Sequence, residues 1–175
     1  MVIVITGPIA SGKSTIAREL GRELGRAGIS VAVIDLDDVH DRLARDGRET
    51  GEAIWALARR EAATLANAFL AEGTAVVVAE GSFNTPGDRA AFAECLDGSV
   101  DPVYVTLRVS FEEALRRAQG DPTRGVSRDP AFLGRYFADF GHAPPTPMTD
   151  LIIETERTTP SAAALSIARL VTPDS

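Results

Sequence analysis

The sequence predicts an α/β fold in which helices cover both faces of a five-stranded parallel sheet. Short apolar segments rich in β-branched residues alternate with longer segments whose apolar residues recur every three or four positions. The first pattern is typical of buried strands and the second of helices with one buried face. Because strands that alternate with helices need crossover connections, the sheet is expected to be parallel. With 175 residues, the chain has the length of one domain, and we expect a single domain over 1–175.

The expected strands are short and mostly apolar, and they cover residues 2–6, 30–35, 74–79, 103–109 and 151–154. The third strand, TAVVVA, is continuously apolar after its first residue, as expected for a central strand buried on both faces.

Five of the expected helices cover residues 39–44, 50–70, 90–96, 111–118 and 160–170. Two more are expected to begin near Lys13 and at Asp129-Pro130. In the first of them, Ile16, Leu20 and Leu24 recur on one face, which is therefore expected to be buried.

Two details of the later helices can be predicted. Ser110 with Glu113 three positions later has the pattern of a capping box, in which each side chain binds the other residue's backbone N–H. Phe132, Tyr136 and Phe140 recur at helical spacing and are expected to form the buried face of the helix after Pro130.

The segment 7–15, GPIASGKST, fits the phosphate-binding pattern G-x-x-x-x-G-K-[ST]. It contains Lys13, which is the only lysine among 18 basic residues, and it lies between the first strand and the first helix, as the motif requires. A glycine-rich turn that merely joins strand to helix would not need the lysine. We therefore predict a three-layer P-loop NTPase fold and a nucleotide triphosphate site formed by Gly7, Ala10, Ser11, Gly12, Lys13, Ser14 and Thr15.

The loop's chemistry follows from its residues. Gly7 and Gly12 let the backbone turn tightly beside an anion, and successive N–H groups at the helix N-terminus then converge on the phosphates. Lys13 is expected to reach the β- and γ-phosphates, and the Ser14 hydroxyl to bind Mg²⁺.

Carboxylates follow the second and third strands, where the ends of parallel strands open toward a ligand crevice. Asp37 is the predicted catalytic residue, which would orient the acceptor hydroxyl, and Asp35 is expected near Mg²⁺, directly or through water. The alternative is that one of them, or Asp38, only caps the following helix. Glu80 would bind the acceptor or order a magnesium water, or equally cap the loop after it.

Several protein classes are excluded. A GTPase needs an Asn-Lys-x-Asp motif, which a chain with one lysine cannot contain, and ATPases of transporters and motors are much longer. The net charge of −7 argues against binding along nucleic acid, and no segment is long and apolar enough for a membrane span or signal peptide. Cys95 is the only cysteine, which excludes a disulfide framework. We expect a cytoplasmic protein, monomeric or weakly dimeric.

The chain resembles small-molecule kinases of the shikimate kinase and chloramphenicol phosphotransferase type over nearly its whole length. The motifs that carry the resemblance are the phosphate loop, the Asp35-Leu36-Asp37 pair, and two arginines seven residues apart. The resemblance implies ATP and Mg²⁺ as cofactors and Asp37 as the residue that orients the acceptor. It also implies that Arg117 stacks on adenine opposite Pro160.

By the same resemblance, residues from about 117 to 131 form a lid, in which Arg124 meets the phosphates. We also expect Arg128 to be catalytic, since a lid that closes arginines over the phosphoryl group favours transfer. The alternative is that these arginines are solvated or pair on the helix surface, Glu112 with Arg116 and Glu113 with Arg117.

The acceptor-binding region is expected over about 36–70. After the third strand, Gly81-Ser82-Phe83 replaces the triple glycine of shikimate kinases, and Arg59 or Arg60 is the only counterpart of the arginines that hold their acidic substrate. Shikimate itself is therefore not the expected acceptor, although Arg59 is included among the candidate acceptor-binding residues.

Three hypotheses about function follow. The first is an ATP- and Mg²⁺-dependent kinase that phosphorylates a hydroxyl of a small molecule, such as a metabolite or antibiotic. The second keeps this chemistry with a nucleoside or nucleic-acid end as acceptor. The third is a non-catalytic regulator that responds to nucleotide.

Overall fold

The computed structural model describes residues 1–46, 51–98, 100–141 and 149–171. A five-stranded sheet with the order β2-β3-β1-β4-β5 forms its centre. The strands are β1 (Val2–Thr6), β2 (Val31–Asp35), β3 (Val76–Gly81), β4 (Val103–Arg108) and β5 (Leu151–Glu154). Every neighbouring pair is parallel, so all five strands end at the same edge of the sheet. The predicted fold class is confirmed.

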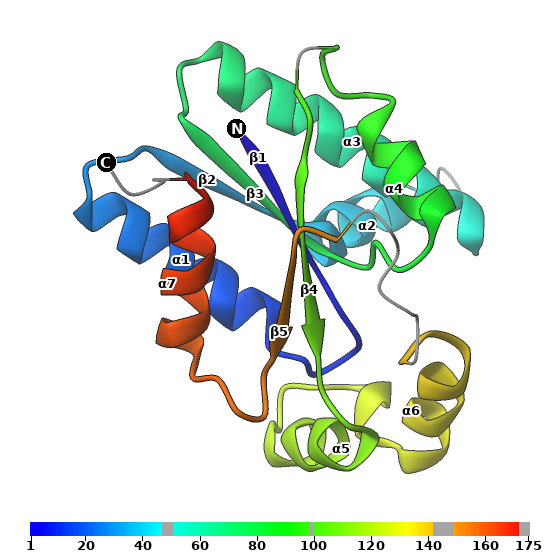
Figure 1. Ribbon diagram of the computed structural model, residues 1–175. Helices are drawn as coiled ribbons and strands as arrows, with labels where there is room; N and C mark the ends of the chain where they lie inside the picture. The colour runs from blue at the N-terminus through cyan, green and yellow to red at the C-terminus, as the bar shows by residue number, and fades with distance from the viewer. Residues whose placement is uncertain (47–50, 99, 142–148, 172–175) are drawn as a thin grey trace.

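Seven α-helices are described: α1 (Lys13–Arg26), α2 (Leu36–Arg45), α3 (Glu52–Ala71), α4 (Pro86–Ala93), α5 (Phe111–Gly120), α6 (Pro130–Tyr136) and α7 (Pro160–Val171). A 3₁₀ turn, η1 (Val126–Arg128), precedes α6, and a π-helical turn, η2 (Phe137–Gly141), follows it. Helices α1 and α7 cover one face of the sheet, and α2, α3 and α4 cover the other (Figure 1).

Alternate residues of the strands supply these two cores. In β1, Val2 and Val4 pack toward α3, whereas Ile3 and Ile5 pack toward α1 and α7. All four are fully buried, as expected for a central parallel strand. The predicted face of α1, formed by Ile16, Leu20 and Leu24, is buried in the second of these cores.

Helices α5 and α6 lie together beyond the carboxyl ends of the strands, away from the two main layers (Figure 1). They have a small core of their own, in which Ala114 and Ala118 of α5 meet Leu133 and Phe137. Ala10 of the phosphate-binding loop belongs to the same cluster, so these helices rest directly on that loop.

The predicted apolar face of the helix after Pro130 is wrong by one residue. Leu133 and Phe137 are buried, whereas Phe132 and Tyr136 are half-buried; the side chain of Phe140 lies outside the described residues. Leu133 and Phe137 form the contact with α5, and the π-helical turn changes the spacing after Tyr136. Tyr136 lies at the edge of this core, where its hydroxyl accepts a hydrogen bond from Asn84.

The predicted capping box at the start of α5 is half present. The Ser110 hydroxyl accepts a hydrogen bond from the Glu113 N–H. The Ser110 N–H instead donates to the carboxylate of Glu156, which follows β5, because the Glu113 carboxylate is engaged by arginines. None of the described helices is both long and apolar enough to cross a lipid bilayer.

Candidate active site

The phosphate-binding loop turns tightly between β1 and α1. A Cβ at Gly7 would lie 2.7 Å from the Leu107 carbonyl oxygen, so no side chain fits there. Gly12 has a φ of +99°, and Ala10 is the one described non-glycine residue with positive φ, at +62°. These left-handed residues curl the loop so that the Lys13 Nζ donates hydrogen bonds to the Gly7 and Pro8 carbonyls, at 3.0 and 3.2 Å.

The charges of four predicted site residues change the pKa of Lys13. Burial lowers the pKa of its ammonium, whereas the carboxylates of Glu80, Asp37 and Asp35 raise it, and the Arg124 guanidinium lowers it further. The structure therefore brings these side chains, which are distant in sequence, to one place at the head of α1. It is the place where the γ-phosphate of a nucleotide is expected.

Asp35 and Glu80 end neighbouring strands and are paired in the register of β2 and β3. Glu80 is 3% exposed and lies close to the side chains of Ser14 and Asp35. Its pKa is raised to about 7, mainly because burial penalises the carboxylate and also because Asp35 is close.

Ser14, Asp35 and Glu80 have the chemistry that a magnesium ion requires, because all three offer oxygen ligands. No group of three or more His, Cys, Asp or Glu side chains suited to a metal occurs among the described residues. An ion here would thus take one or two carboxylates, with phosphate and water oxygens completing its coordination, as is usual for Mg²⁺ in kinases.

The structure distinguishes the aspartates after β2. Asp35 is the N-cap of α2, and its Oδ1 accepts a hydrogen bond from the Asp37 N–H at 2.9 Å. Asp37 is thereby freed from capping. Asp37 is also exposed by surface area, but the protein around its carboxyl desolvates the charged form and raises its pKa; Asp35 adds to the shift and Lys13 opposes it. Asp38 lies exposed in the first turn of the helix.

A cavity of about 300 Å³ opens beside the phosphate-binding loop and extends to α5 and the start of α7. Its lining consists of Ser11, Gly12, Thr15, Ile16, Glu113, Arg116, Arg117, Thr155, Thr158 and Pro160. The two residues predicted to hold adenine, Arg117 and Pro160, thus lie in one cavity next to the loop. Its position is suited to the nucleoside part of a nucleotide.

Arg117 also braces the walls of this cavity. Its Nε donates to Glu113 Oε1 at 2.7 Å, and its Nη2 donates to the Thr155 carbonyl at 2.8 Å. Its Nη1 lies 3.1 Å from Thr155 Oγ1 and 3.4 Å from the carbonyls of Ala10 and Ser11. One guanidinium therefore connects α5, the phosphate-binding loop and the segment after β5.

The other lid arginines have fewer partners. Arg124 Nε lies 3.3 Å from Asp121 Oδ2, and Arg128 Nη2 lies 3.5 Å from the Gln119 carbonyl.

On the helix surface, Glu113 pairs with both Arg116 and Arg117, while Glu112 has no ion pair among the described residues. The predicted pairing of Glu112 with Arg116 is therefore wrong.

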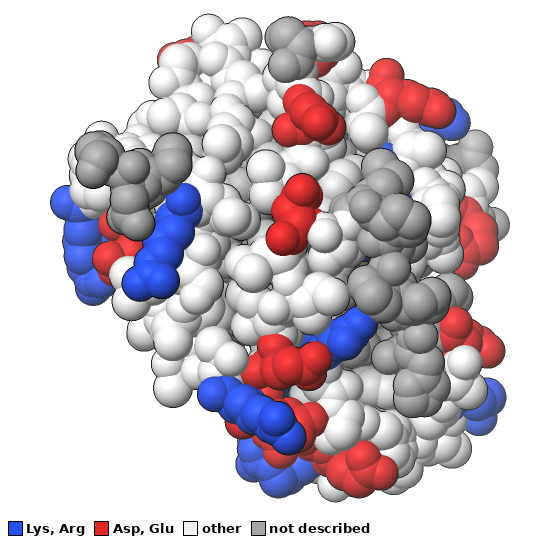
Figure 2. Space-filling model, viewed as in Figure 1, with Lys and Arg blue, Asp and Glu red and all other residues white. Residues whose placement is uncertain are grey.

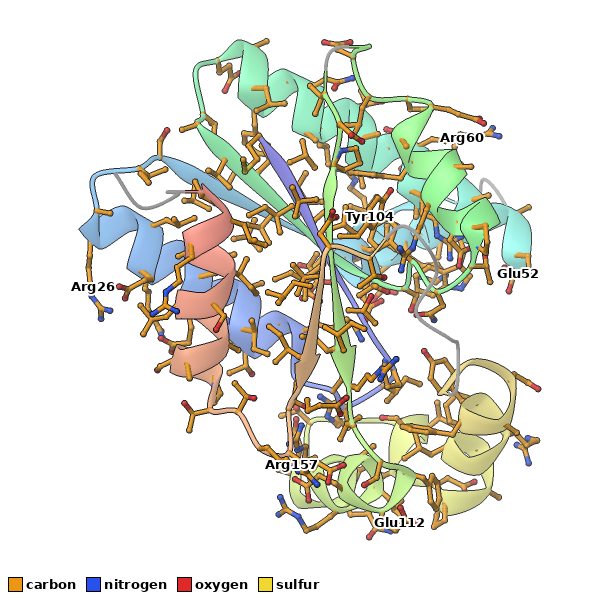
Figure 3. All side chains as sticks on the ribbon, viewed as in Figure 1. Arg26, Glu52, Arg60, Tyr104, Glu112 and Arg157 are labelled. Atoms are coloured by element: carbon orange, nitrogen blue, oxygen red, sulfur yellow. The ribbon has the colours of Figure 1, made fainter. Side chains whose placement is uncertain are left out.

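Arg59 lies in the predicted acceptor region but is 6% exposed. Its Nη2 lies 3.0 Å from Asp88 Oδ1, and its Nε donates to the Ser82 carbonyl at 3.0 Å. These contacts support the loop after β3, and direct binding of an acceptor by Arg59 stays a prediction. Arg60 instead projects from the outer surface of α3 (Figure 3).

Sequence reasoning missed Asn84 and Tyr136, which meet near Asp37. The Asn84 Nδ2 donates to the Tyr136 hydroxyl at 3.2 Å, and Asp37 is one of the charges that raise the pKa of that hydroxyl. The only sequence signal was the polar Ser82–Asn84 stretch directly after a strand end. Of the aromatic residues, Phe83 is core, packed against Phe92, whereas Trp55 stacks on His40 at 4.0 Å between centroids.

A phosphate-binding loop at the head of α1, in the centre of a parallel sheet, places the chain among the P-loop proteins. More narrowly, the chain belongs to the AAA domain family, whose model matches residues 2–129. No curated protein matches the chain significantly.

Solved structures share the fold along the whole chain. The Mycobacterium tuberculosis APS kinase CysC, in complex with AMPPNP and APS, has a TM-score of 0.74 and 22% identity over 98% of this chain and 96% of its own. A gluconokinase from Sinorhizobium meliloti 1021 has a TM-score of 0.63 and 18% identity, covering 98% and 93%. The shikimate kinase from Acinetobacter baumannii in complex with shikimate has a TM-score of 0.58 and 19% identity, covering 98% and 92%. The predicted resemblance to small-molecule P-loop kinases is confirmed at the level of the fold.

Proposed function

We propose that this protein is an ATP- and Mg²⁺-dependent kinase that transfers the γ-phosphoryl group to a hydroxyl of a small molecule. The observation that carries the proposal is the convergence on Lys13 of Asp37, Asp35, Glu80 and Arg124. Phosphoryl transfer needs a cation on the transferring group, a metal site, a carboxylate to orient the acceptor and a second cation over the developing charge. Each requirement has a residue here.

The division of roles follows from the positions of the side chains. Lys13 holds the β- and γ-phosphates, and Ser14, Asp35 and Glu80 would hold Mg²⁺, which would neutralise charge on the phosphates. Asp37 accepts the proton of the acceptor hydroxyl, while Arg124, and with it Arg128, stabilises the transferring group. Arg117 and Pro160 hold the adenine in the cavity beside the loop.

The charge distribution supports a small molecule rather than a nucleic-acid end as acceptor. The net charge is −7, and on the face seen in Figure 2 the arginines stand beside acidic side chains instead of forming a basic patch. A surface that tracks a nucleic-acid backbone would need such a patch.

Asp37→Asn is the variant that tests the proposal, since it keeps the shape of the side chain but cannot accept a proton. Nucleotide affinity should stay within a few-fold of wild type, while transfer to the acceptor should fall by roughly 10²-fold or more. Isothermal titration with AMPPNP and a labelled-phosphate transfer assay measure the two effects. Asp35→Asn is the matched control, expected to raise the Mg²⁺ requirement instead. If the Asp37 variant transfers phosphate normally, Asp37 is not the base. If the wild type hydrolyses ATP but phosphorylates no hydroxyl compound, the result favours the hypothesis of a non-catalytic regulator.

A further inference from the structure

Polar side chains from three parts of the chain meet beside the phosphate-binding loop, and none of them lines the nucleoside cavity. The Tyr136 hydroxyl on α6 accepts a hydrogen bond from Asn84 Nδ2 at 3.2 Å and lies near the Ser82 side chain. Thr6 Oγ1 donates to Asn84 Oδ1 at 3.3 Å. We refer to Thr6, Ser82, Asn84 and Tyr136 as the acceptor-side cluster. Its four members are uncharged and rich in hydrogen-bonding groups.

This cluster lies next to the reacting centre. Thr6 immediately precedes Gly7, whose carbonyl accepts a hydrogen bond from Lys13 Nζ at 3.0 Å. On its other side, the charge of Asp37 acts on the Tyr136 hydroxyl. A molecule whose reactive hydroxyl faces Asp37 would therefore place its neighbouring groups against the acceptor-side cluster.

Two arginines lie behind the cluster, but their charges are used within the protein. Arg59, 6% exposed, pairs with Asp88 at 3.0 Å and donates to the Ser82 carbonyl. Arg89, 2% exposed, donates from Nε to the Phe83 carbonyl at 3.2 Å, with its guanidinium 4.6 Å from the centre of the Tyr104 ring. Both hold the backbone of the loop that carries Ser82 and Asn84, so neither is presented to the crevice.

Charges of both signs act at the acceptor position, and the cationic groups among them have other partners. The charges that act on Asp37 belong to Lys13, Asp35, Asp41 and His40. His40 Nδ1 is itself paired with Asp41 Oδ1 at 3.1 Å, and Lys13 is required by the phosphates. A carboxylate or sulfate on the acceptor would thus meet several carboxylates without a dedicated cation in the described part of the chain, which is electrostatically costly.

Resting on the proposed kinase activity, we propose that the acceptor is a polyhydroxyl compound without an acidic group, with one hydroxyl at Asp37 and another bound by Tyr136 and Asn84. A hydroxyl both donates and accepts, which matches the amide of Asn84 and the phenol of Tyr136. This specificity differs from that of a site built to hold an acid with arginines.

The first test measures binding without requiring catalysis. The ¹⁵N-labelled protein, loaded with Mg²⁺ and AMPPNP, is titrated with compounds paired by the presence of an acid: glucitol with gluconate, and glucose with glucuronate. The side-chain amide signals of Asn84 should shift at a concentration at least ~10-fold lower for the uncharged member of a pair. Tighter binding of the acidic members, or no shift of these signals with any compound, would overturn the proposal.

The second test uses the two tyrosines of the chain as a matched pair. Tyr136→Phe should raise KM for the best uncharged acceptor by about 3- to 10-fold, the effect of losing one hydrogen bond, with KM for ATP unchanged. Tyr104→Phe removes a buried hydroxyl that has no hydrogen-bond partner among the described residues, so it should leave both constants unchanged. Equal effects of the two substitutions, or an unchanged acceptor KM in Tyr136→Phe, would overturn the assignment.

The outcomes separate this inference from the proposed function. An uncharged compound that binds at Asn84 but is never phosphorylated would contradict the kinase proposal and leave the acceptor chemistry intact. Efficient phosphorylation of an acidic compound in preference to its uncharged partner would support the kinase proposal and contradict the proposed acceptor chemistry.

Discussion

At Lys13, two opposing influences act on one ammonium group. Burial lowers its pKa, and the carboxylates of Glu80, Asp37 and Asp35 raise it. The carboxylates thus help to keep a cation in a partly desolvated loop, where a compact charge interacts strongly with phosphate.

Lys13→Ala should reduce phosphoryl transfer by at least about 10²-fold, because it removes a charge that stabilises the transferring group. Lys13→Arg should also fail, since a planar guanidinium cannot replace an ammonium that binds two carbonyls inside a tight loop. Steady-state kinetics measure both effects, and thermal unfolding shows whether the fold survives. Near-normal turnover by Lys13→Ala would contradict the nucleotide site.

Glu80 gives a prediction about pH. Its pKa is about 7 in the folded protein, against an ordinary value of 4.5. Between these values the folded state holds a proton that the unfolded state releases, so stability falls as pH rises from about 4.5 to 7 and stays lower above it. Glu80→Gln cannot ionise, and without metal or nucleotide it should be more stable than wild type above pH 7 by roughly 1–3 kcal/mol. The difference should vanish below about pH 4.5.

Urea unfolding at several pH values measures this effect. A stability difference that does not change with pH would show that Glu80 ionises normally in the folded protein. Asp38→Asn is a suitable control, because Asp38 is exposed in the first turn of α2 and should give a small difference.

Contacts between site residues could be predicted from the sequence only where the backbone of the fold fixes both residues directly. Asp35 and Glu80 end strands of a parallel sheet, so their meeting follows from the fold alone. Asn84 and Tyr136 could not be paired in advance, because their contact depends on the path of a loop and on the face that α6 turns toward α5. The burial of Arg59 could not be predicted either, because its partner Asp88 lies on a different helix.

At the scale of elements, most boundaries with recognised capping residues were predicted correctly, but α2, expected over 39–44, begins at Leu36 behind its N-cap Asp35. Strand β5 and the starts of α5, α6 and α7 lie where the sequence predicted them. Helix α4 was expected over 90–96 but covers Pro86–Ala93. Thr85 and Asp88 form a full capping box there, with Pro86 in the first turn, which is a stronger start signal than the apolar residues used for the prediction.

Helix α5 and the segment after it predict two different kinetic defects. Arg117 lines the nucleoside cavity and joins its walls, so Arg117→Ala should mainly raise KM for ATP. Arg124 acts on the charge at Lys13, so Arg124→Ala should mainly lower kcat. Steady-state kinetics with varied ATP separate the two effects. Arg22→Ala is the control, because Arg22 is exposed on α1, pairs with Glu19 and does not line the cavity. Identical defects in the Arg117 and Arg124 variants would contradict this division.

For the whole molecule, the strand order explains why the site forms where it does. Strand β1 lies between β3 and β4, so the phosphate-binding loop emerges at the centre of the sheet with Glu80 on one side. The sequence predicted five parallel strands but not their order, which is set by packing between segments far apart in the chain. The helices α5 and α6 complete the crevice from beyond the sheet edge, where they contact the loop through a small core and through Arg117 (Figure 1).

That small contact predicts that the lid, residues 117–131, moves relative to the sheet when ligands bind. Trypsin should cleave after Arg124 or Arg128 in the free protein and about tenfold more slowly with Mg²⁺, AMPPNP and acceptor bound, because closure lowers the population of the open, cleavable form. Cleavage after Arg26 is the internal control, since this residue lies at the far end of α1 (Figure 3) and reports only overall stabilisation. Mass spectrometry of the fragments gives the ratio of the two rates. A ratio that ligands leave unchanged, in protein that they stabilise against heat, would mean that the lid is already closed and that Arg124 reaches the phosphates without moving.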